Sequence, residues 1–265
     1  MNEDIDKFVK FANKLADEAR TISLFYFKKK LNIKSKDQKK FDPVTIADIN
    51  VQKKINKIIK KNYPSHSILG EELSIKNKSD FEWCIDPIDG TKSYIQGIPL
   101  WGTLIALSKK DQIILGLVDI PALNERYLGY KKTAYKLING KKLVIKVGKN
   151  KKLKNAILNT TSPYVFANKS DQNSFERLSK KTKSTRLGGD CYSYCLLADG
   201  HADIIVESGL APWDIRALEP IIKNAGGILK TWDNDNVFNG GKIIASVSKS
   251  LFNNAAEVLN KKKPS

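Results

Sequence analysis

The feature that most constrains this chain is an apolar segment that runs directly into two aspartates, Asp86 and Asp89, in the sequence WCIDPIDGT. The apolar part is typical of a buried strand. Pro87 fixes the backbone between the carboxylates, and Gly90 permits a sharp turn after them. Both carboxylates can then point at one centre, while the amides of Gly90 and Thr91 stay available. This predicts a metal site beside an anion site, because Mg²⁺ prefers oxygen ligands and amides at a helix start accept phosphate.

Further carboxylates stand at predicted element ends: Glu71 and Glu72 after the apolar residues 67–69, Asp42 and Asp48 around a helix start, and Asp214 after Trp213. Each has a structural explanation. Thr45 and Asp48 form a capping-box pattern, Asp214 suits a helix N-cap, and the glutamate pair suits a solvated loop. The Asp-Pro and Asp-Gly dipeptides are common in turns. Adjacent residues of an extended chain face opposite ways, so one glutamate is expected to point at the metals and the other to lie further out.

Histidine and cysteine offer little for catalysis. His66 and His201 stand in unrelated surroundings, which leaves no material for a histidine triad. The three cysteines lack the paired spacing of a zinc site and are too few for a disulfide framework, so we interpret them as buried hydrophobes. Catalysis, if present, must therefore depend on carboxylates.

The net charge of +18 comes mostly from lysine, which occurs in short runs along the whole chain. Nucleic-acid-binding proteins usually concentrate charge on one face and interleave it with aromatic residues. The diffuse pattern favours lysine as a general surface residue, with no specific nucleic-acid partner. No apolar run reaches the length of a membrane span, and the acidic N-terminus lacks a secretory pattern. We therefore expect a cytoplasmic protein without a membrane partner.

Hydrophobic spacing predicts two opening helices, over about residues 4–29 and 44–62, separated by a polar loop at 34–40. Short strand-like runs follow, with a tight hairpin at Asn139-Gly140, and indicate a meandering sheet. From about residue 150 the pattern changes to alternating strands and helices, with helices near 171–180, 191–199, 214–225 and 249–260. We expect two tightly packed halves, residues 1–150 and 151–265, without a flexible linker.

Taken together, the acidic segments resemble the inositol-monophosphatase family of metal-dependent phosphatases. The family signature is an acidic pair after a strand, then DPIDGT, then WD, and finally AGG after a helix. Here these motifs occupy residues 70–72, 86–91, 213–214 and 225–227, so the match spans nearly the whole chain. The resemblance implies an α/β (α+β) fold, a layered α-β-α-β-α sandwich of two sheets, and a homodimer.

The resemblance also implies roles for individual residues. Two or three Mg²⁺ ions would be bound by Glu71, Asp86, the carbonyl of Ile88, Asp89 and Asp214. Asp48 and Thr91 would orient the attacking water beside Glu71, and Gly90 and Thr91 would hold the phosphate. One metal would make hydroxide available at neutral pH, and another would neutralise the departing alcohol during in-line displacement. No covalent phosphoenzyme is needed.

The run GGDCYSYCLLADG at residues 188–200 is similar to the histidinol-phosphate phosphatase branch of the family. Inositol-type relatives usually carry a small neutral residue in place of Asp190, and a carboxylate suits a substrate with an ammonium and an imidazole group. Glu207, seven residues before Asp214, matches a substrate-contacting glutamate, and Asp89 would also face the substrate. Alternatively, Asp190 is simply the N-cap of the helix at 191–199. Tyr192 and Tyr194 could line the pocket, although aromatic packing is the default.

We therefore expect a Mg²⁺-dependent phosphomonoester hydrolase acting on a small phosphorylated metabolite, with histidinol phosphate as the leading substrate in histidine biosynthesis. The close alternative is an inositol monophosphatase or another sugar-phosphate phosphatase. An alternative of another class is an accessory protein of RNA or of a transcription complex. The complete set of metal-ligand candidates argues against a purely non-catalytic role, because uncompensated carboxylates are costly to keep together.

Overall fold

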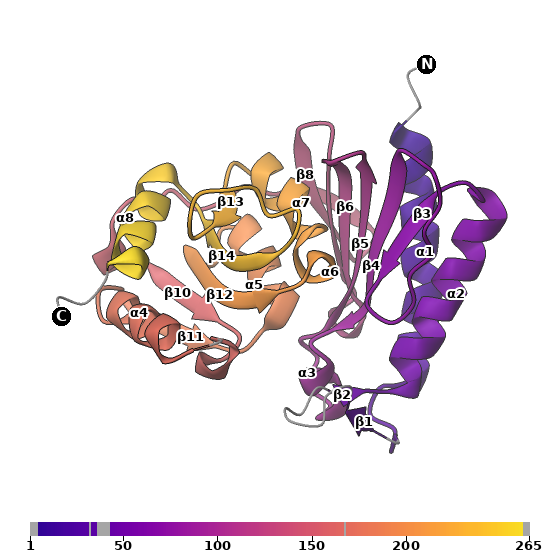
Figure 1. The fold of residues 1–265 in the computed structure, drawn as a ribbon, viewed down its shortest axis with the longest axis horizontal. Coiled ribbons are helices and arrows are strands. Elements are labelled where there is room, and N and C mark those ends of the chain that lie inside the picture. The colour runs from indigo at the N-terminus through magenta and orange to yellow at the C-terminus, as the bar shows by residue number, and fades with distance from the viewer. Residues whose placement is uncertain (1–4, 32, 36–42, 167, 262–265) are drawn as a thin grey trace.

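The computed structural model describes residues 5–31, 33–35, 43–166 and 168–261. Asp42 and most of the predicted polar loop lie outside these ranges. The described chain forms two large β-sheets and three layers of helices, in the order helix, sheet, helix, sheet, helix, besides a separate two-stranded pair (Figure 1). The layered α-β-α-β-α sandwich expected from the sequence is confirmed.

The first sheet is a meander, as predicted. Its strands pair in sequence order from β3 to β9, with β3 and β4 parallel and the other neighbours antiparallel. The predicted hairpin joins β8 to β9, where Asn139 and Gly140 have φ values of 50° and 71°. These left-handed angles match the twist of the flanking strands and explain the Asn-Gly sequence. The strands are β3 (Ser67–Gly70), β4 (Phe81–Asp89), β5 (Gly102–Lys109), β6 (Gln112–Ile120), β7 (Glu125–Tyr130), β8 (Thr133–Ile138) and β9 (Lys141–Val144).

The second sheet has the strand order β11-β10-β12-β14-β13. Strand β10 is parallel to β11 and β12, whereas β14 is antiparallel to β12 and β13. The strands are β10 (Ile157–Thr160), β11 (Ser184–Leu187), β12 (Ile204–Leu210), β13 (Ile228–Thr231) and β14 (Gly241–Ser246). A separate short antiparallel pair consists of β1 (Lys34–Ser35) and β2 (Pro43–Val44).

The helices occupy three layers (Figure 1). The outer face of the first sheet is covered by α1 (Ile5–Tyr26) and α2 (Ile46–Asn62). Between the sheets lie α5 (Asp190–Ala198), α6 (Pro212–Ile215) and α7 (Leu218–Asn224). The far face of the second sheet is covered by α4 (Lys169–Ser179) and α8 (Lys249–Asn260), and the short α3 (Thr91–Ile95) follows β4.

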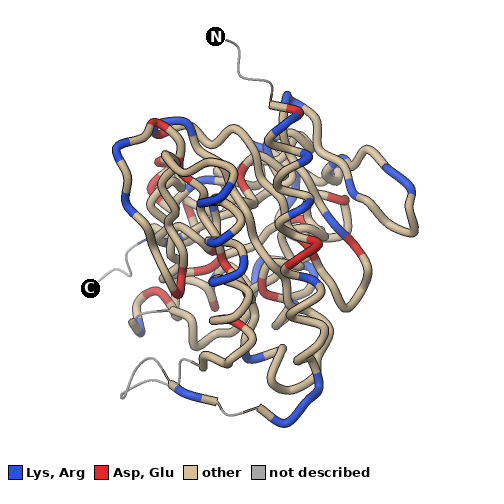
Figure 2. The backbone as a smooth tube through the Cα atoms, turned by 90° about the vertical axis from the view of Figure 1, so that its right-hand side faces the viewer, with Lys and Arg blue, Asp and Glu red and all other residues tan. Residues whose placement is uncertain are grey.

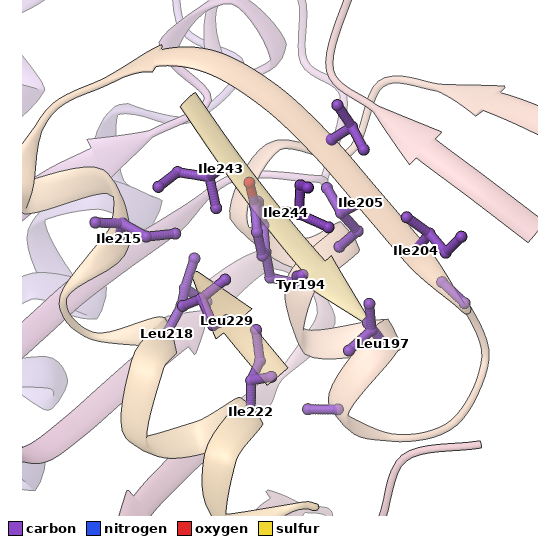
Figure 3. Packing of buried hydrophobic residues seen from close by; sticks show 14 of the residues in the cluster. Tyr194, Leu197, Ile204, Ile205, Ile215, Leu218, Ile222, Leu229, Ile243 and Ile244 are labelled. Carbon is purple, nitrogen blue, oxygen red and sulfur yellow. The ribbon is translucent and has the colours of Figure 1, made fainter. Parts of the chain in front are cut away.

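The central layer contains the largest buried cluster, to which both sheets contribute. Figure 3 shows Tyr194 and Leu197 of α5 packed with Leu218 and Ile222 of α7 and with isoleucines of β12 and β14. A second cluster lies between the first sheet and α1 and α2, whose apolar residues recur at helical spacing on one face. Both faces of the first sheet are therefore apolar and buried.

Two glycines allow the central layer to lie directly on the first sheet. A Cβ at Gly116 would lie 2.0 Å from the carbonyl oxygen of Ala217, and a Cβ at Gly129 would lie 2.4 Å from the backbone nitrogen of Ile221. Only a residue without a side chain permits this approach. The α6–α7 segment, and with it Asp214, is therefore held against the sheet.

The helix predicted at 214–225 differs from the observed one. It begins earlier, at Pro212, and divides into α6 and α7 around Ala217. Proline is favoured in the first turn of a helix, because the backbone N–H that it lacks would have no partner within the helix there. This preference explains the early start at Pro212. Pro220 lacks the N–H that would continue the helical ladder back to Arg216, which accounts for the interruption.

Other expectations agree with the structure or remain predictions. Cys84, Cys191 and Cys195 are free and buried, as interpreted from the sequence. Lysine and arginine are distributed along much of the chain, as Figure 2 shows. Within the described ranges, no helix is long and apolar enough to cross a membrane. The first sheet ends at Val144 and the second begins at Ile157, while the division into halves at residue 150 stays a prediction.

Candidate metal and phosphate site

A β-bulge brings Asp86 and Asp89 to the same centre. On a regular strand, residues three apart point to opposite faces. The pairing of β4 with β5 shifts register between these two aspartates, so that Asp86 opposes Leu104 while Asp89 opposes Gly102. The extra residue re-aims the side chain, which is a common use of bulges next to functional sites. The backbone N–H of Ile88 donates to Oδ1 of Asp86 at 3.0 Å and holds the bulge in place.

The third carboxylate comes from the other half of the chain. Asp86, Asp89 and Asp214 each offer an oxygen such that the three oxygens lie within 4.8 Å of one another. Asp214 is not the N-cap considered from the sequence, because α6 starts at Pro212 and Ala211 occupies that position. Its carboxylate instead accepts the backbone N–H of Ala211 at 2.7 Å. The structure thus brings together three of the predicted ligands.

The charges at this centre repel one another. Burial raises the pKa of Asp86 well above its ordinary value, and the charges of Glu71, Asp89 and Asp214 raise it further. Burial also raises the pKa of Asp89, with additional contributions from Asp190 and Asp214. Carboxylates gathered in this way need a positive partner, and a purely oxygen donor set fits a hard divalent cation rather than zinc or copper. The residues present therefore fit the metal that the sequence predicts.

Glu71 and Glu72 follow β3 in a bend, not on the extended chain assumed from the sequence. Glu71 lines the cavity at the acidic centre and interacts with Asp86, whereas Glu72 is not among the cavity's described lining residues. Glu71 lies one residue beyond β3, and its backbone N–H donates to the carbonyl of Ile85 on β4 at 3.1 Å. The parallel pairing of β3 with β4 thus places the ends of both strands at one site.

The predicted turn after Asp89 is present. Gly90 has a φ of +80° and forms the N-cap of α3, a conformation that favours glycine. The hydroxyl of Thr91 donates to the carbonyl oxygen of Ile88 at 3.0 Å. A carbonyl oxygen has two lone pairs, so this bond leaves one for the metal role predicted for Ile88. Gly90 and Thr91 both line the cavity.

Asp48 forms the capping box predicted for it. Its Oδ2 accepts the backbone N–H of Thr45 at 2.8 Å and the Thr45 hydroxyl at 2.6 Å. Burial raises the pKa of Asp48 to about 6, although the bonds from Thr45 oppose the shift and the Glu71 charge adds to it. The structural interpretation is thus confirmed, and the role in orienting water stays a prediction.

The acidic centre opens into a cavity of about 370 Å³ between the two halves. Burial raises the pKa of Asp190 on its wall, although the hydrogen bond from Ser93 and the charge of nearby Lys92 act to lower it. The lining residues are Pro43, Glu71, Asp89, Gly90, Thr91, Lys92, Thr161, Val165, Asp190, Cys191, Tyr194, Glu207, Gly209, Leu210, Ala211, Trp213 and Asp214.

Asp190 lies in this cavity but is not the helix N-cap. Gly189, with a φ of 109°, takes that position, and Asp190 is the first residue of α5, with an unusual φ of 42°. Its Oδ2 accepts the hydroxyl of Ser93 at 3.1 Å, which ties the start of α5 to α3. The next residue, Cys191, donates its backbone N–H to Oδ2 of Asp89 at 2.7 Å. The second half of the chain therefore orients a predicted metal ligand of the first.

Glu207 is buried at the wall of the cavity. Its Oε1 accepts the backbone N–H of Thr161 at 2.7 Å, and its Oε2 accepts the hydroxyl of Tyr194 at 3.1 Å. Burial nevertheless raises its pKa. Tyr194 thus lines the cavity, whereas Tyr192 points elsewhere and donates to Oε2 of Glu125.

Polar residues of the described site that were not found from the sequence include Ser93, Lys92 and Thr161. Ser93 and Lys92 follow directly on the DPIDGT motif, so the short helix after that motif was the available signal. Thr161 contributes only a backbone N–H at the end of β10, and no sequence pattern marks such a group.

Comparison with known proteins agrees with this geometry. The model of the inositol monophosphatase family matches residues 4–263. The chain belongs to this family. The family is metal-dependent, and the acidic cluster could hold a metal ion.

Individual relatives of this inositol monophosphatase family member carry different names. A protein of Arabidopsis thaliana described as a bifunctional phosphatase, chloroplastic, is 44% identical over 86% of this chain, which spans 65% of the plant protein. A histidinol-phosphatase of Chlorobaculum parvum is 33% identical, with 83% of each chain covered. The solved structure of an inositol monophosphatase from Zymomonas mobilis has 35% identity and a TM-score of 0.86, covering 98% of this chain and 100% of its own.

Proposed function

We propose that this phosphatase is a Mg²⁺-dependent histidinol-phosphatase, which hydrolyses L-histidinol phosphate to L-histidinol and phosphate. The observation that carries the proposal is the carboxylate of Asp190 in the wall of the acidic cavity, directly beside the glycine turn suited to phosphate. The 33% identity to a histidinol-phosphatase supports it independently.

The predicted roles of the chain's residues form a consistent mechanism. Glu71, Asp86, Asp89, Asp214 and the carbonyl of Ile88 would hold two or three Mg²⁺ ions. When bound, these ions would supply an activated water and neutralise charge on the departing alcohol.

The remaining groups position the reactants. The amides at the start of α3 would bind the phosphate oxygens. Asp48, with a pKa of about 6, is suited to accept a proton from the attacking water near neutral pH. The hydroxyl of Thr91, which donates to the carbonyl of Ile88, would orient that water.

The charge of the cavity favours a cationic alcohol. Asp190 and Glu207 add two carboxylates to the wall beyond the metal cluster, and the charge of Asp190 acts on Glu207. Histidinol carries an ammonium group and an imidazole, either of which can donate a charge-assisted hydrogen bond to a carboxylate. A neutral polyol would bring no positive charge to these carboxylates, beside which Lys92 is the cation among the described lining residues.

A substrate comparison tests the proposal. With Mg²⁺, the purified protein is expected to release phosphate from L-histidinol phosphate much faster than from inositol monophosphate. Asp190→Asn keeps an oxygen that can accept the Ser93 hydroxyl but removes the charge. It should lower kcat/KM for histidinol phosphate about tenfold to a hundredfold, and that for inositol monophosphate much less. Asp233→Asn, at an exposed position, is the matched control for loss of one negative charge.

Two outcomes would redirect the assignment. Equal losses on both substrates would remove Asp190 from substrate selection. Faster hydrolysis of inositol monophosphate would favour the second candidate, an inositol monophosphatase or another sugar-phosphate phosphatase. That candidate is supported by the fold and 35% identity of the Zymomonas mobilis enzyme.

The remaining expectations stay predictions: a homodimer, a cytoplasmic location and the absence of a specific nucleic-acid partner. A salt titration of nucleic-acid binding tests the accessory role in an RNA or transcription complex. Nonspecific charge attraction fades at moderate salt, so the absence of binding there would leave only such attraction.

A further inference from the structure

A second cavity lies at the opposite end of β4 from the acidic centre. Its volume is about 490 Å³, larger than that of the cavity at the metal ligands. Phe81, the first residue of β4, lines it, whereas Asp86 and Asp89 lie toward the other end of the strand. At about 3.3 Å per residue, the two sites are roughly 25 Å apart. A ligand in this second cavity would therefore not touch the phosphate site.

The floor of the cavity is apolar and comes from both halves of the chain. Phe8 of α1, Phe81 and Ile114 of the first sheet and Pro220 of α7 line it together with Tyr130. Pro220 is held here because Gly129 lets α7 approach β7 closely. The cavity is thus shaped by the same contact that seats α7 on the sheet.

The rim is positively charged. Among the described lining residues there is one carboxylate, that of Glu219, and there are four lysines: Lys109, Lys131, Lys132 and Lys223. Lys223 pairs with Glu219 at 3.0 Å, and Lys131 pairs with Asp6 at 2.7 Å. Within the described part of the chain, Lys132 forms no ion pair. The lining therefore keeps an excess of positive charge above an apolar floor.

The turn that presents two of these lysines is itself unusual. Lys131 and Lys132 join β7 to β8 with φ values of 46° and 61°. A two-residue turn of this kind favours asparagine and glycine, and a left-handed conformation costs other residues about 1 kcal/mol each. The next hairpin uses Asn-Gly, whereas the β5–β6 turn also holds a lysine, Lys110, in a left-handed conformation with a φ of 53°.

We propose that this cavity binds a small organic anion that has an aromatic or aliphatic body and a carboxylate, sulfonate or phosphate group. The body would lie on Phe8 and Pro220, and the anionic group would face Lys132 and Lys109, whose ammonium lies 5.0 Å from the centre of the Phe81 ring. Apolar burial supplies the attraction of the body, and the lysines select for the charge. This inference does not depend on the proposed substrate.

The test uses the full chain and the fluorescent anion anilinonaphthalene sulfonate, titrated with Mg²⁺ and saturating inorganic phosphate present to occupy the metal site. We expect saturable binding at one site per chain. The double variant Lys109→Gln/Lys132→Gln should weaken it roughly threefold to tenfold, as expected for two partly exposed charge contacts. The matched control, Lys57→Gln/Lys60→Gln, removes the same charge from the exposed face of α2 and should leave the affinity unchanged.

A second probe, uncharged phenylnaphthylamine, separates charge recognition from apolar binding. Its affinity should be the same in the wild type and in both double variants. The proposal is overturned if the sulfonate dye does not bind saturably under these conditions, or if both double variants weaken its binding equally. It is also overturned if the cavity variant weakens both dyes to the same extent.

Discussion

Replacing Asp48 by asparagine is expected to stabilise the metal-free protein and to damage catalysis. Asp48 is only 1% exposed, and its carboxylate accepts two hydrogen bonds from Thr45. Asparagine can accept the same bonds through its amide oxygen, so the cap of α2 is retained while the buried charge is removed. The substitution therefore separates the structural role of the residue from its charge.

The size of the stabilisation follows from the pKa. Burial raises the pKa of Asp48 from 3.8 to about 6, and one pKa unit corresponds to about 1.4 kcal/mol. Keeping the group ionised in the folded state at pH 8 thus costs on the order of 3 kcal/mol. Because the folded-state pKa is the higher one, this cost is absent below about pH 4 and develops as the pH rises through about 6.

Thermal unfolding of the wild type and Asp48→Asn, in buffer with a metal chelator, measures the effect. The melting temperature of the variant should exceed that of the wild type by roughly 6 to 10 °C at pH 8, and the two should converge near pH 4. With Mg²⁺, the phosphatase activity of the variant should fall by about 10² to 10⁴, as for loss of a general base. A variant that is less stable than the wild type at pH 8 would show that the charge stabilises the helix start, and full activity would remove Asp48 from catalysis.

The other predictions concern the metal ligands and the packing that seats them. Asp89→Asn should lower activity by more than about 10³ and abolish the rise in melting temperature that Mg²⁺ gives the wild type, while its circular dichroism spectrum stays native; an active variant would contradict the metal assignment. Gly116→Ala places a methyl group 2.0 Å from the carbonyl of Ala217, so it should reduce stability by about 1 to 3 kcal/mol and weaken Mg²⁺ binding through displacement of nearby Asp214. Gly148→Ala, whose Cβ would meet only ordinary contacts, is its control and should change neither quantity.

Much of the fold was predictable because its local signals agree with one another. The two opening helices, the meander and the Asn139-Gly140 hairpin follow from hydrophobic period and turn chemistry, which act within a few residues. The boundaries of α8 match those predicted, while the helix expected at 214–225 is divided. There, the local signal of Pro220 competes with the apolar spacing that favours one continuous helix.

The candidate site was predictable as a set of residues but not as a geometry. The sequence by itself determined that carboxylates had to carry any chemistry, since it offers two histidines and no paired cysteines. It also determined that Asp86, Asp89 and Gly90 lie where a strand meets a turn.

Only the tertiary structure decided which carboxylates meet. The bulge that turns Asp86 and Asp89 to one side depends on pairing with β5, and the position of Asp214 depends on the contact of Ala217 with Gly116. The orientation of Asp190 toward Ser93, in place of a helix cap, likewise requires α3 and α5 to pack together. Such contacts join residues that are far apart in the chain, and no pattern within a few neighbouring residues encodes them.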